Sequence, residues 1–415
     1  MYIIVLIKRW ILIVAISSVL LISRGSLDIS PSAELAKSHI YSLVGWQIEN
    51  FPDKWLYKAF RLFSGRNEHI SENIAALTEY SLLITRLSNQ EDSLRESISL
   101  NASKSVNDAL QEAIQKDIEL TQGAILSLRN RVEEFLESQI SSAIRSEGIG
   151  YSGPAQSHFP PVDFRLTYSP KILVTSARNR IDMIEGILLE DTISSNDMDI
   201  LESDILEELN LSAYVTDIGG LATYPSVVNH RASIRSLINT ATHEWLHHYL
   251  FFNPLGQGYW ADNNMRTINE TTANIFGREI SQLIYQHLEH SGLKPIFTET
   301  TTADITVETF DFSYEMHSTR LSVDKLLSQG KIDEAEAYMQ DRRLDFLSKG
   351  YNIRKLNQAY FAFHGTYSDS PTSVSPIYAQ LQSIRSNSNS LEGFIDTIAK
   401  ISSHEEFLAL IQEFD

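Results

Sequence analysis

The amino-acid sequence predicts an α+β fold that is mostly helical, with long N-terminal helices ahead of a smaller region that contains strands. Three observations predict it. No proline occurs between Pro52 and Pro154, and apolar residues recur there every three or four positions. Short runs rich in β-branched residues follow between residues 164 and 225. After His230 the apolar spacing is helical again almost to the C-terminus.

Composition narrows the classes of protein that the chain can belong to. Its 415 residues are 43% hydrophobic, enough for two or three domains with a sizeable core. The formal charge is −19, from 34 Lys+Arg against 53 Asp+Glu, which argues against nucleic acid as a partner. Cysteine is absent, which excludes disulfides and cysteine-ligated zinc. Any metal site must therefore use histidines and carboxylates.

Residues 1–25 form the first of four expected parts and have the character of a membrane signal. Lys8 and Arg9 precede an apolar run from Trp10 to Ser23. No convincing cleavage site follows this run, so we first expect an uncleaved single-pass anchor in the cell membrane, with the rest of the chain on the outer side. A cleaved export signal, which would give a secreted protein, and a cytoplasmic location are the alternatives.

Residues 26–150 form the second part, in which we expect a helical hairpin or a coiled coil. Two long apolar series, at residues 70–98 and 106–140, predict its helices, and the break falls between Ser99 and Ser105. The segment carries no catalytic constellation. It is therefore expected to be a spacer or an oligomerisation element, with possible self-association through residues 70–145.

Residues 151–300 are the third part and residues 301–415 a helical fourth part that completes the cleft. Residues 164–168 and 171–177 are predicted strands, and a helix is expected at 197–209. The run LSAYVTDIGGLATYP that follows predicts one or two strands, because Gly219 and Gly220 interrupt it.

Residues 243–247 read His-Glu-Trp-Leu-His, an HExxH motif within a helical pattern. Positions i and i+4 of a helix lie on one face, so the imidazoles of His243 and His247 can reach one Zn²⁺ at about 2.0–2.1 Å. Glu244 is turned about 100° from His243, close enough to hold a water at the ion without being a ligand.

Glu270 supplies a third ligand to this pair. It lies in a second helical stretch, Thr267 to about His290, across a loop punctuated by proline and glycine. Two antiparallel helices joined by that loop bring Glu270 over the two histidines. The resulting His₂Glu set leaves one position open, as is typical of catalytic zinc, and predicts a single Zn²⁺ ion as the cofactor.

Three neighbours of the motif are assigned by helical spacing. Asn274 is one turn beyond Glu270 and is expected to hydrogen-bond a ligand imidazole. Asn239 is one turn before His243 and is expected to line the pocket. His248 points off the ligand face, so we expect it not to be a ligand.

The HExxH motif with its downstream Asn-Glu pair resembles the gluzincin metallopeptidases. The resemblance covers residues 210–285 closely and 310–380 loosely. It implies a zincin-like catalytic domain, in which a small sheet with an edge strand accompanies an active-site helix and a glutamate helix. It also implies that His243, His247 and Glu270 are the ligands and that Glu244 is the general base.

The chain is also similar to a little-characterised group of bacterial aminopeptidase-like proteins with a late helix rich in Asn, Ala and Tyr, here residues 356–360 leading to 365–367. The Gly-x-Met-Glu-Asn segment by which large gluzincin aminopeptidases bind a free amine is missing, so aminopeptidase and endopeptidase both stay open. The resemblance implies substrate contacts on the strand and the late helix, at Gly219, Gly220, Tyr224 and Asn357. Candidate donors to the transition-state oxyanion are Tyr360, His364, Tyr367 and Arg320.

The leading expectation is thus a membrane-anchored zinc metallopeptidase that acts on a peptide or protein. One alternative is a zinc hydrolase acting on a non-peptide amide such as cell-envelope material. The other is a non-catalytic helical scaffold of the cell envelope, in which the zinc site is structural or degenerate.

Overall fold

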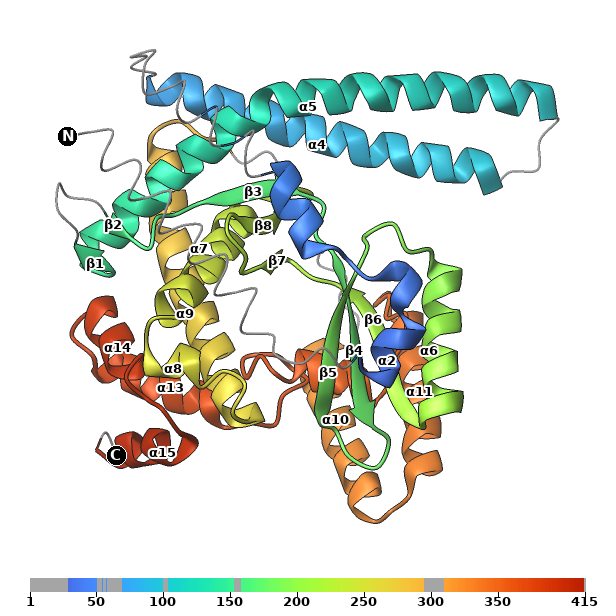
Figure 1. The fold of residues 1–415 in the computed structure, drawn as a ribbon, viewed down its shortest axis with the longest axis vertical. Coiled ribbons are helices and arrows are strands. Elements are labelled where there is room, and N and C mark those ends of the chain that lie inside the picture. Colours follow the sequence, from blue (N-terminus) through green and yellow to red (C-terminus); the bar gives the residue numbers. More distant parts are fainter. Residues whose placement is uncertain are drawn as a thin grey trace.

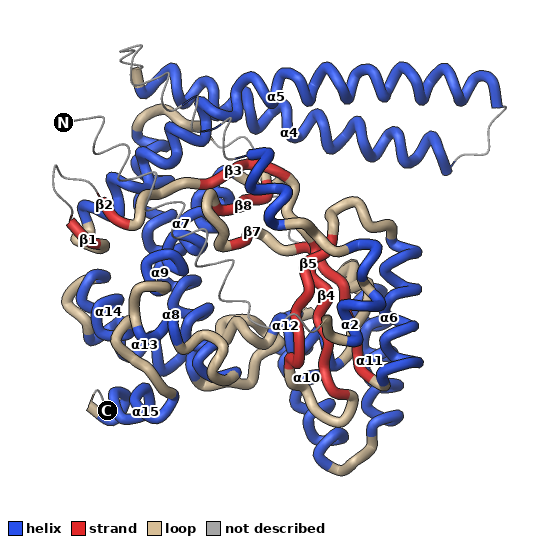
Figure 2. The backbone as a smooth tube through the Cα atoms, viewed as in Figure 1, coloured by secondary structure: helices blue, strands red, loops and turns tan. Residues whose placement is uncertain are grey.

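A computed structural model describes residues 29–50, 54, 57, 69–99, 104–152, 158–294 and 310–413. The described chain is mostly helical, as predicted, and its strands form three small sheets where one was expected (Figures 1 and 2). Within these ranges no helix is both long enough and apolar enough to cross a membrane. The anchor predicted for residues 1–25 lies outside them.

Two long helices, α4 (Ile70–Ser99) and α5 (Lys104–Ser146), form the hairpin along one side of the molecule (Figure 1). The break is where the sequence predicts it. The hairpin shares a hydrophobic core with the helices that follow, because its buried residues pack in the same cluster as theirs. Members from the hairpin are Leu77, Leu87, Ile118, Val132, Leu136 and Ile140. Self-association through residues 70–145 stays a prediction.

The first three-stranded sheet has the order β3-β8-β7, formed by β3 (Phe164–Thr167), β8 (Ser226–Asn229) and β7 (Gly220–Leu221). Strand β3 runs parallel to β8, and β7 runs antiparallel to it, with Gly220 opposite Val228. Strand β7 is therefore an edge strand. A short two-stranded ribbon, β1 (Tyr151–Ser152) with β2 (His158–Phe159), precedes this sheet.

The second three-stranded sheet is antiparallel, in the order β5-β4-β6: β5 (Met183–Leu189), β4 (Lys171–Ala177) and β6 (Leu211–Asp217). Alternate residues of β4 face opposite sides, as the period of a strand requires. Leu173 packs toward α2 (Pro31–Leu35) and α6 (Ser195–Leu209), whereas Val174 packs toward α10 (Phe312–Ser328), α11 (Ile332–Ser348) and α12 (Gln358–His364). The sheet is thus covered by helices on both faces.

The remaining helices are α7 (Ile234–Leu250), α8 (Pro254–Gln257), α9 (Asn263–His290), α13 (Ile377–Asn387), α14 (Leu391–Ile398) and α15 (His404–Gln412), with a short 3-10 helix at Lys37–His39. The helices after α12 return to pack against α9 (Figure 1). The predicted interruption at Gly219 is confirmed, since β6 and β7 belong to different sheets. Strands β5 and β8 were not predicted: β5 contains a charged residue and a glycine, and β8 has only four residues.

Candidate metal centre

Helix α7 carries the HExxH segment and is fixed by its apolar face. Ser233 caps the helix by accepting a hydrogen bond from Ser236 N at 3.2 Å. Trp245 is 1% exposed, and its indole Nε1 donates to Pro160 O at 2.9 Å. Because this face is held in the core, His243 and His247 on another face keep partial exposure. The helix therefore presents both imidazoles where an ion can reach them.

Helix α9 approaches α7 closely because residue 277 is glycine. A Cβ atom there would lie 2.9 Å from Asn239 Oδ1 and 3.1 Å from the Asn239 carbonyl oxygen. The hydroxyl of Thr242 also reaches the carbonyl of Gly277 at 3.4 Å. Asp262 caps α9 by accepting from Met265 N at 2.9 Å, so the helix begins four residues before the predicted start at Thr267. The close crossing brings Glu270 to the two histidines.

His243, His247 and Glu270 converge in a geometry that fits a metal ion. The Nε2 atoms of the two histidines lie 3.0 Å apart. Glu270 Oε2 lies 3.4 Å from His243 Nε2 and 3.6 Å from His247 Nε2. A point about 1.9 Å from all three atoms exists, near the distance of about 2.0–2.1 Å at which zinc binds such ligands. Within the described ranges this is the only group of three or more metal-binding side chains.

The triad residues set one another's charges. Burial opposes the ionisation of Glu270, but the two imidazoles outweigh it and hold the pKa of its carboxyl well below the usual range. Burial likewise opposes protonation of His247, yet Glu270 outweighs it and raises the pKa of His247 to about 9. A cation bound between the three side chains would replace the proton on His247 as the positive charge that stabilises the Glu270 carboxylate.

Two residues that were not assigned from the sequence hold members of the triad in place. Asn269 Oδ1 lies 2.9 Å from His247 Nδ1, which leaves Nε2 free to bind an ion. The Tyr259 hydroxyl donates to Glu270 Oε1 at 2.5 Å, which leaves Oε2 free to bind an ion. The Asn-Glu pair in the sequence could have identified Asn269, because its neighbour Glu270 is a proposed ligand. No spacing rule pointed to Tyr259, which belongs to the loop between the helices.

Glu244 lies against the edge strand β7. Its side chain is 6% exposed, and a Cβ atom on Gly220 would lie 2.5 Å from its Oε1. Burial raises the pKa of Glu244, although the neighbouring His243 and His247 oppose the rise. Glycine at position 220 therefore allows the strand to pass directly over the carboxylate.

Of the candidate donors, Tyr367 lies beside the triad. Its ring centroid is 6.5 Å from that of His243. Burial and the negative charges of Glu270 and Glu244 raise its pKa well above the usual value, so its hydroxyl keeps its proton. Ser368 N donates to Thr271 Oγ1 at 3.1 Å, which fixes the loop of Tyr367 to α9.

Tyr360, His364 and Arg320 make contacts with residues outside the triad. The rings of Tyr360 and His364 are tilted relative to each other, with their centroids 4.4 Å apart, and both contact the ring of Tyr214 of β6. Arg320 pairs with Asp324 at 2.9 Å, and its Nη1 donates to the carbonyl of Thr372 at 3.2 Å. None of these contacts is with a residue of the triad.

The predicted contact of Asn274 with a ligand imidazole is wrong. Its amide donates to Asp369 Oδ1 at 3.0 Å, and Arg278 pairs with the same carboxylate. Asn274 therefore helps to hold the loop that carries Tyr367. Asn269 makes the imidazole contact instead. It lies directly beside Glu270, and its side chain faces His247, whereas Asn274 lies one turn beyond Glu270.

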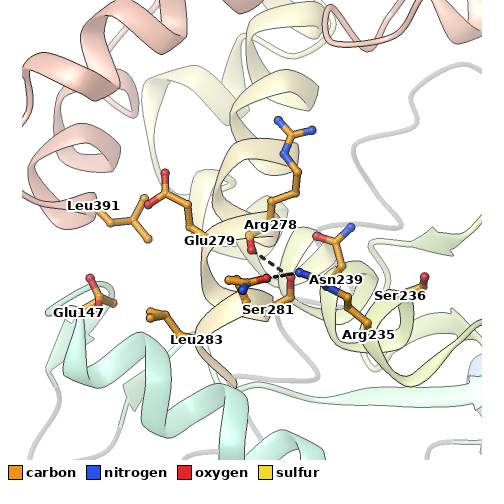
Figure 3. Close-up of a pocket in the computed structure, with 10 residues that line it drawn as sticks. Glu147, Arg235, Ser236, Asn239, Arg278, Glu279, Ser281, Leu283 and Leu391 are labelled. Carbon is orange, nitrogen blue, oxygen red and sulfur yellow. Dashed lines mark hydrogen bonds between the residues drawn. The ribbon is translucent and has the colours of Figure 1, made fainter. Parts of the chain in front are cut away.

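Asn239 lines a cavity, but not one formed around the triad. The cavity has a volume of about 790 Å³ and lies among α7, α9, the start of α14 and the end of α5 (Figure 3). Its other lining residues include Arg235, Glu279 and Leu391. Asn239 thus faces a neighbouring space one turn from His243.

The four predicted substrate contacts form two groups, the glycines and the two larger residues. Gly219 and Gly220 adjoin helix α7: a Cβ atom on Gly219 would contact Thr240 Oγ1 at 3.8 Å. Tyr224 is 2% exposed, and its hydroxyl donates to Pro161 O at 3.4 Å. Asn357 caps α12 and donates to the Ala213 carbonyl at 2.8 Å. The last two residues therefore stabilise the fold in this structure.

His248 is outside the triad, in agreement with the expectation. It is buried, with its Nε2 3.0 Å from the Thr223 carbonyl oxygen, and burial lowers its pKa to about 4.

Comparison of the chain with protein-family models, with curated proteins and with solved structures gave no match. Any assignment of function therefore depends on the residues of this chain and their geometry.

Proposed function

We propose that the chain is a zinc metallopeptidase, with His243, His247 and Glu270 as the ligands of one ion and Glu244 as the general base. One observation carries the proposal: three ligand atoms lie within 4.8 Å of one another, next to a buried carboxylate from the same helix turn. His243, His247 and Glu270 would hold the ion, and a zinc ion bound there would supply a Lewis acid that polarises a substrate carbonyl and lowers the pKa of a water to about 7.

Glu244 is suited to move the proton in such a reaction. Because burial raises the pKa of its carboxyl, it holds a proton more readily than an exposed glutamate does. It can take the proton of the attacking water and pass it to the leaving amine. The absence of a side chain at Gly220 keeps strand β7 within contact distance of this carboxylate.

Strand β7 supports a peptide as the substrate. It is an edge of the β3-β8-β7 sheet, so its outer backbone groups face no further strand in the described part of the chain. An extended peptide can bind such an edge by backbone hydrogen bonds. Since Gly220 adjoins Glu244, a peptide bound there would pass next to the carboxylate.

Tyr367 is the candidate donor to the oxyanion. Its hydroxyl stays protonated at neutral pH, and its ring is near His243. A neutral hydroxyl aimed at a developing negative charge stabilises the transition state by hydrogen bonding. Exopeptidase and endopeptidase activity both remain compatible with this arrangement.

The first experiment measures metal content and hydrolysis in the same preparations. The purified protein should contain one zinc per chain and should cleave members of a peptide library with free and with blocked N-termini. Glu244→Gln should keep its zinc and lose about 10²–10⁴-fold in hydrolysis rate, because the proton acceptor is gone. His243→Ala should lose both zinc and hydrolysis.

Glu289→Gln is the matched control, since Glu289 is an exposed glutamate near the end of α9. It should retain zinc and full activity. Hydrolysis that persists in Glu244→Gln would refute the assigned base. Zinc without any hydrolysis in the unaltered protein would favour the scaffold alternative, and cleavage of non-peptide amides alone would favour the other one.

A further inference from the structure

A guanidinium group lies over two aromatic rings at the start of α9. Arg266 Cζ lies 5.8 Å from the ring centroid of Tyr259 and 5.1 Å from that of Trp260. The two rings are themselves 4.8 Å apart. Since the hydroxyl of Tyr259 binds Glu270, one tyrosine contacts both the metal triad and the guanidinium. Arg266 is thus a neighbour of the proposed centre.

The charge of Arg266 has no counterpart within the described ranges. Its side chain makes one long hydrogen bond, 3.5 Å to Asn263 Oδ1, and no ion pair, and its buried Nε has no hydrogen-bond partner. The acidic residues one turn to either side are engaged elsewhere. Asp262 caps the helix, and Glu270 belongs to the triad.

The position of Arg266 makes its charge costly to the fold. It is the fourth residue of α9, in the first turn, where the helix dipole disfavours a cation. By contrast, Arg278 further along the same helix is paired with Asp369. A guanidinium held over two rings at the positive end of a helix, next to the proposed metal centre, is a preorganised binding site for a carboxylate.

Trp260 supplies an apolar wall beside this charge. Its side chain is 74% exposed, the largest exposed fraction among the large hydrophobic residues of the described chain. An exposed indole on a loop that contacts the triad through its neighbour Tyr259 is suited to cover the aliphatic part of a bound residue.

We propose that Arg266 and Trp260 form a carboxylate-binding subsite beside the proposed metal centre, so that the preferred substrates carry a carboxylate close to the cleaved bond. The carboxylate can belong to an acidic side chain or to a free C-terminus. This inference rests on the proposed peptidase function, but it concerns binding and can be measured apart from hydrolysis.

The experiment measures tryptophan fluorescence of zinc-loaded Glu244→Gln protein titrated with peptides. One series is acetylated and amidated and carries a single Glu, moved through each position, with the matching Gln peptides as reference. A second series carries Gln with a free C-terminal carboxylate. We expect at least one carboxylate peptide to bind about tenfold more tightly than its neutral counterpart.

Arg266→Gln should abolish that preference, and Trp260→Phe should remove most of the fluorescence change. The matched control is Arg235→Gln, because Arg235 of α7 also lacks an ion pair in the described chain but lines the separate cavity. It should keep the preference. Equal binding of charged and neutral peptides, or a preference that survives in Arg266→Gln, would overturn the subsite. A preserved preference in a protein that hydrolyses nothing would instead overturn the peptidase and leave the subsite.

Discussion

At the scale of single residues, two adjacent glycines have different roles. Gly220 lies so close to Glu244 and Thr240 that an added methyl group would fall 2.5 Å from the carboxylate oxygen and 2.6 Å from Thr240 Cγ2. Gly219 has ordinary room, 3.8 Å from Thr240 Oγ1. Neither glycine adopts a positive φ, so close approach is the physical requirement at position 220.

Gly220→Ala should therefore reduce hydrolysis at least about tenfold, because Glu244 or strand β7 must shift by several tenths of an ångström. The zinc content should not change, since no ligand is touched. Peptide hydrolysis and metal analysis of Gly219→Ala provide the matched control, which should behave like the unaltered protein. Equal activity of the two variants would show that β7 does not constrain the base.

At the scale of elements, helix α5 is joined to strand β3 by buried carboxylates. Glu133 and Glu137, one turn apart, accept hydrogen bonds from Leu166 N at 2.7 Å and Phe164 N at 3.0 Å. They close the edge of β3 that the sheet leaves open. Lys54 and Arg165, both 1% exposed, supply the compensating positive charges. The hairpin is thus bound to the sheet that carries β7.

Glu133→Ala should lower the free energy of unfolding by about 1–3 kcal/mol, because it removes the acceptor of the buried Leu166 amide and one of the ion-pair partners of Lys54 and Arg165. Urea unfolding measures the change. Glu119→Ala on the exposed side of the same helix is the control, with an expected effect within about 0.5 kcal/mol. A loss below about 1 kcal/mol for Glu133→Ala would mean that water satisfies this junction.

At the scale of the whole molecule, the buried histidines outside the centre link stability to pH. His230 is 7% exposed, and its ring lies 4.4 Å from that of Tyr168. Burial, aided by the positive charge of Arg129, lowers its pKa to about 4. Because the unfolded chain binds the proton at a pKa of about 6.5, stability is full above that pH and declines as the pH falls toward 4.

His230→Phe should therefore reduce the loss in the free energy of unfolding that the protein shows as the pH falls. The unaltered protein should lose about 2 kcal/mol between pH 7 and pH 5 from this histidine alone, and the variant should lack that loss. Denaturant unfolding at both pH values measures the difference, and phenylalanine preserves the ring contact. An unchanged pH slope in the variant would show that His230 is not neutral in the folded state.

Much of the fold could be predicted from periodicity, and the failures have local causes. The hairpin break, the strands at residues 164–177, the helix at 197–209 and the helices after residue 230 follow from apolar spacing and from Gly and Pro. Strand β5 was not predicted because Glu185 and Gly186 interrupt its apolar pattern. Its partner β4 stabilises it all the same, through a ladder from Leu189 to Glu185.

The sequence by itself determined the three proposed ligands and the proposed base, because helical spacing holds two imidazoles on one face whatever surrounds them. Only the tertiary structure decided which other side chains join them. Asn269, Tyr259 and Tyr367 come from an adjacent position, a connecting loop and a loop almost a hundred residues further along the chain. Their approach depends on the close crossing of α7 and α9 and on the contacts that fasten the Tyr367 loop to α9, which no local pattern encodes.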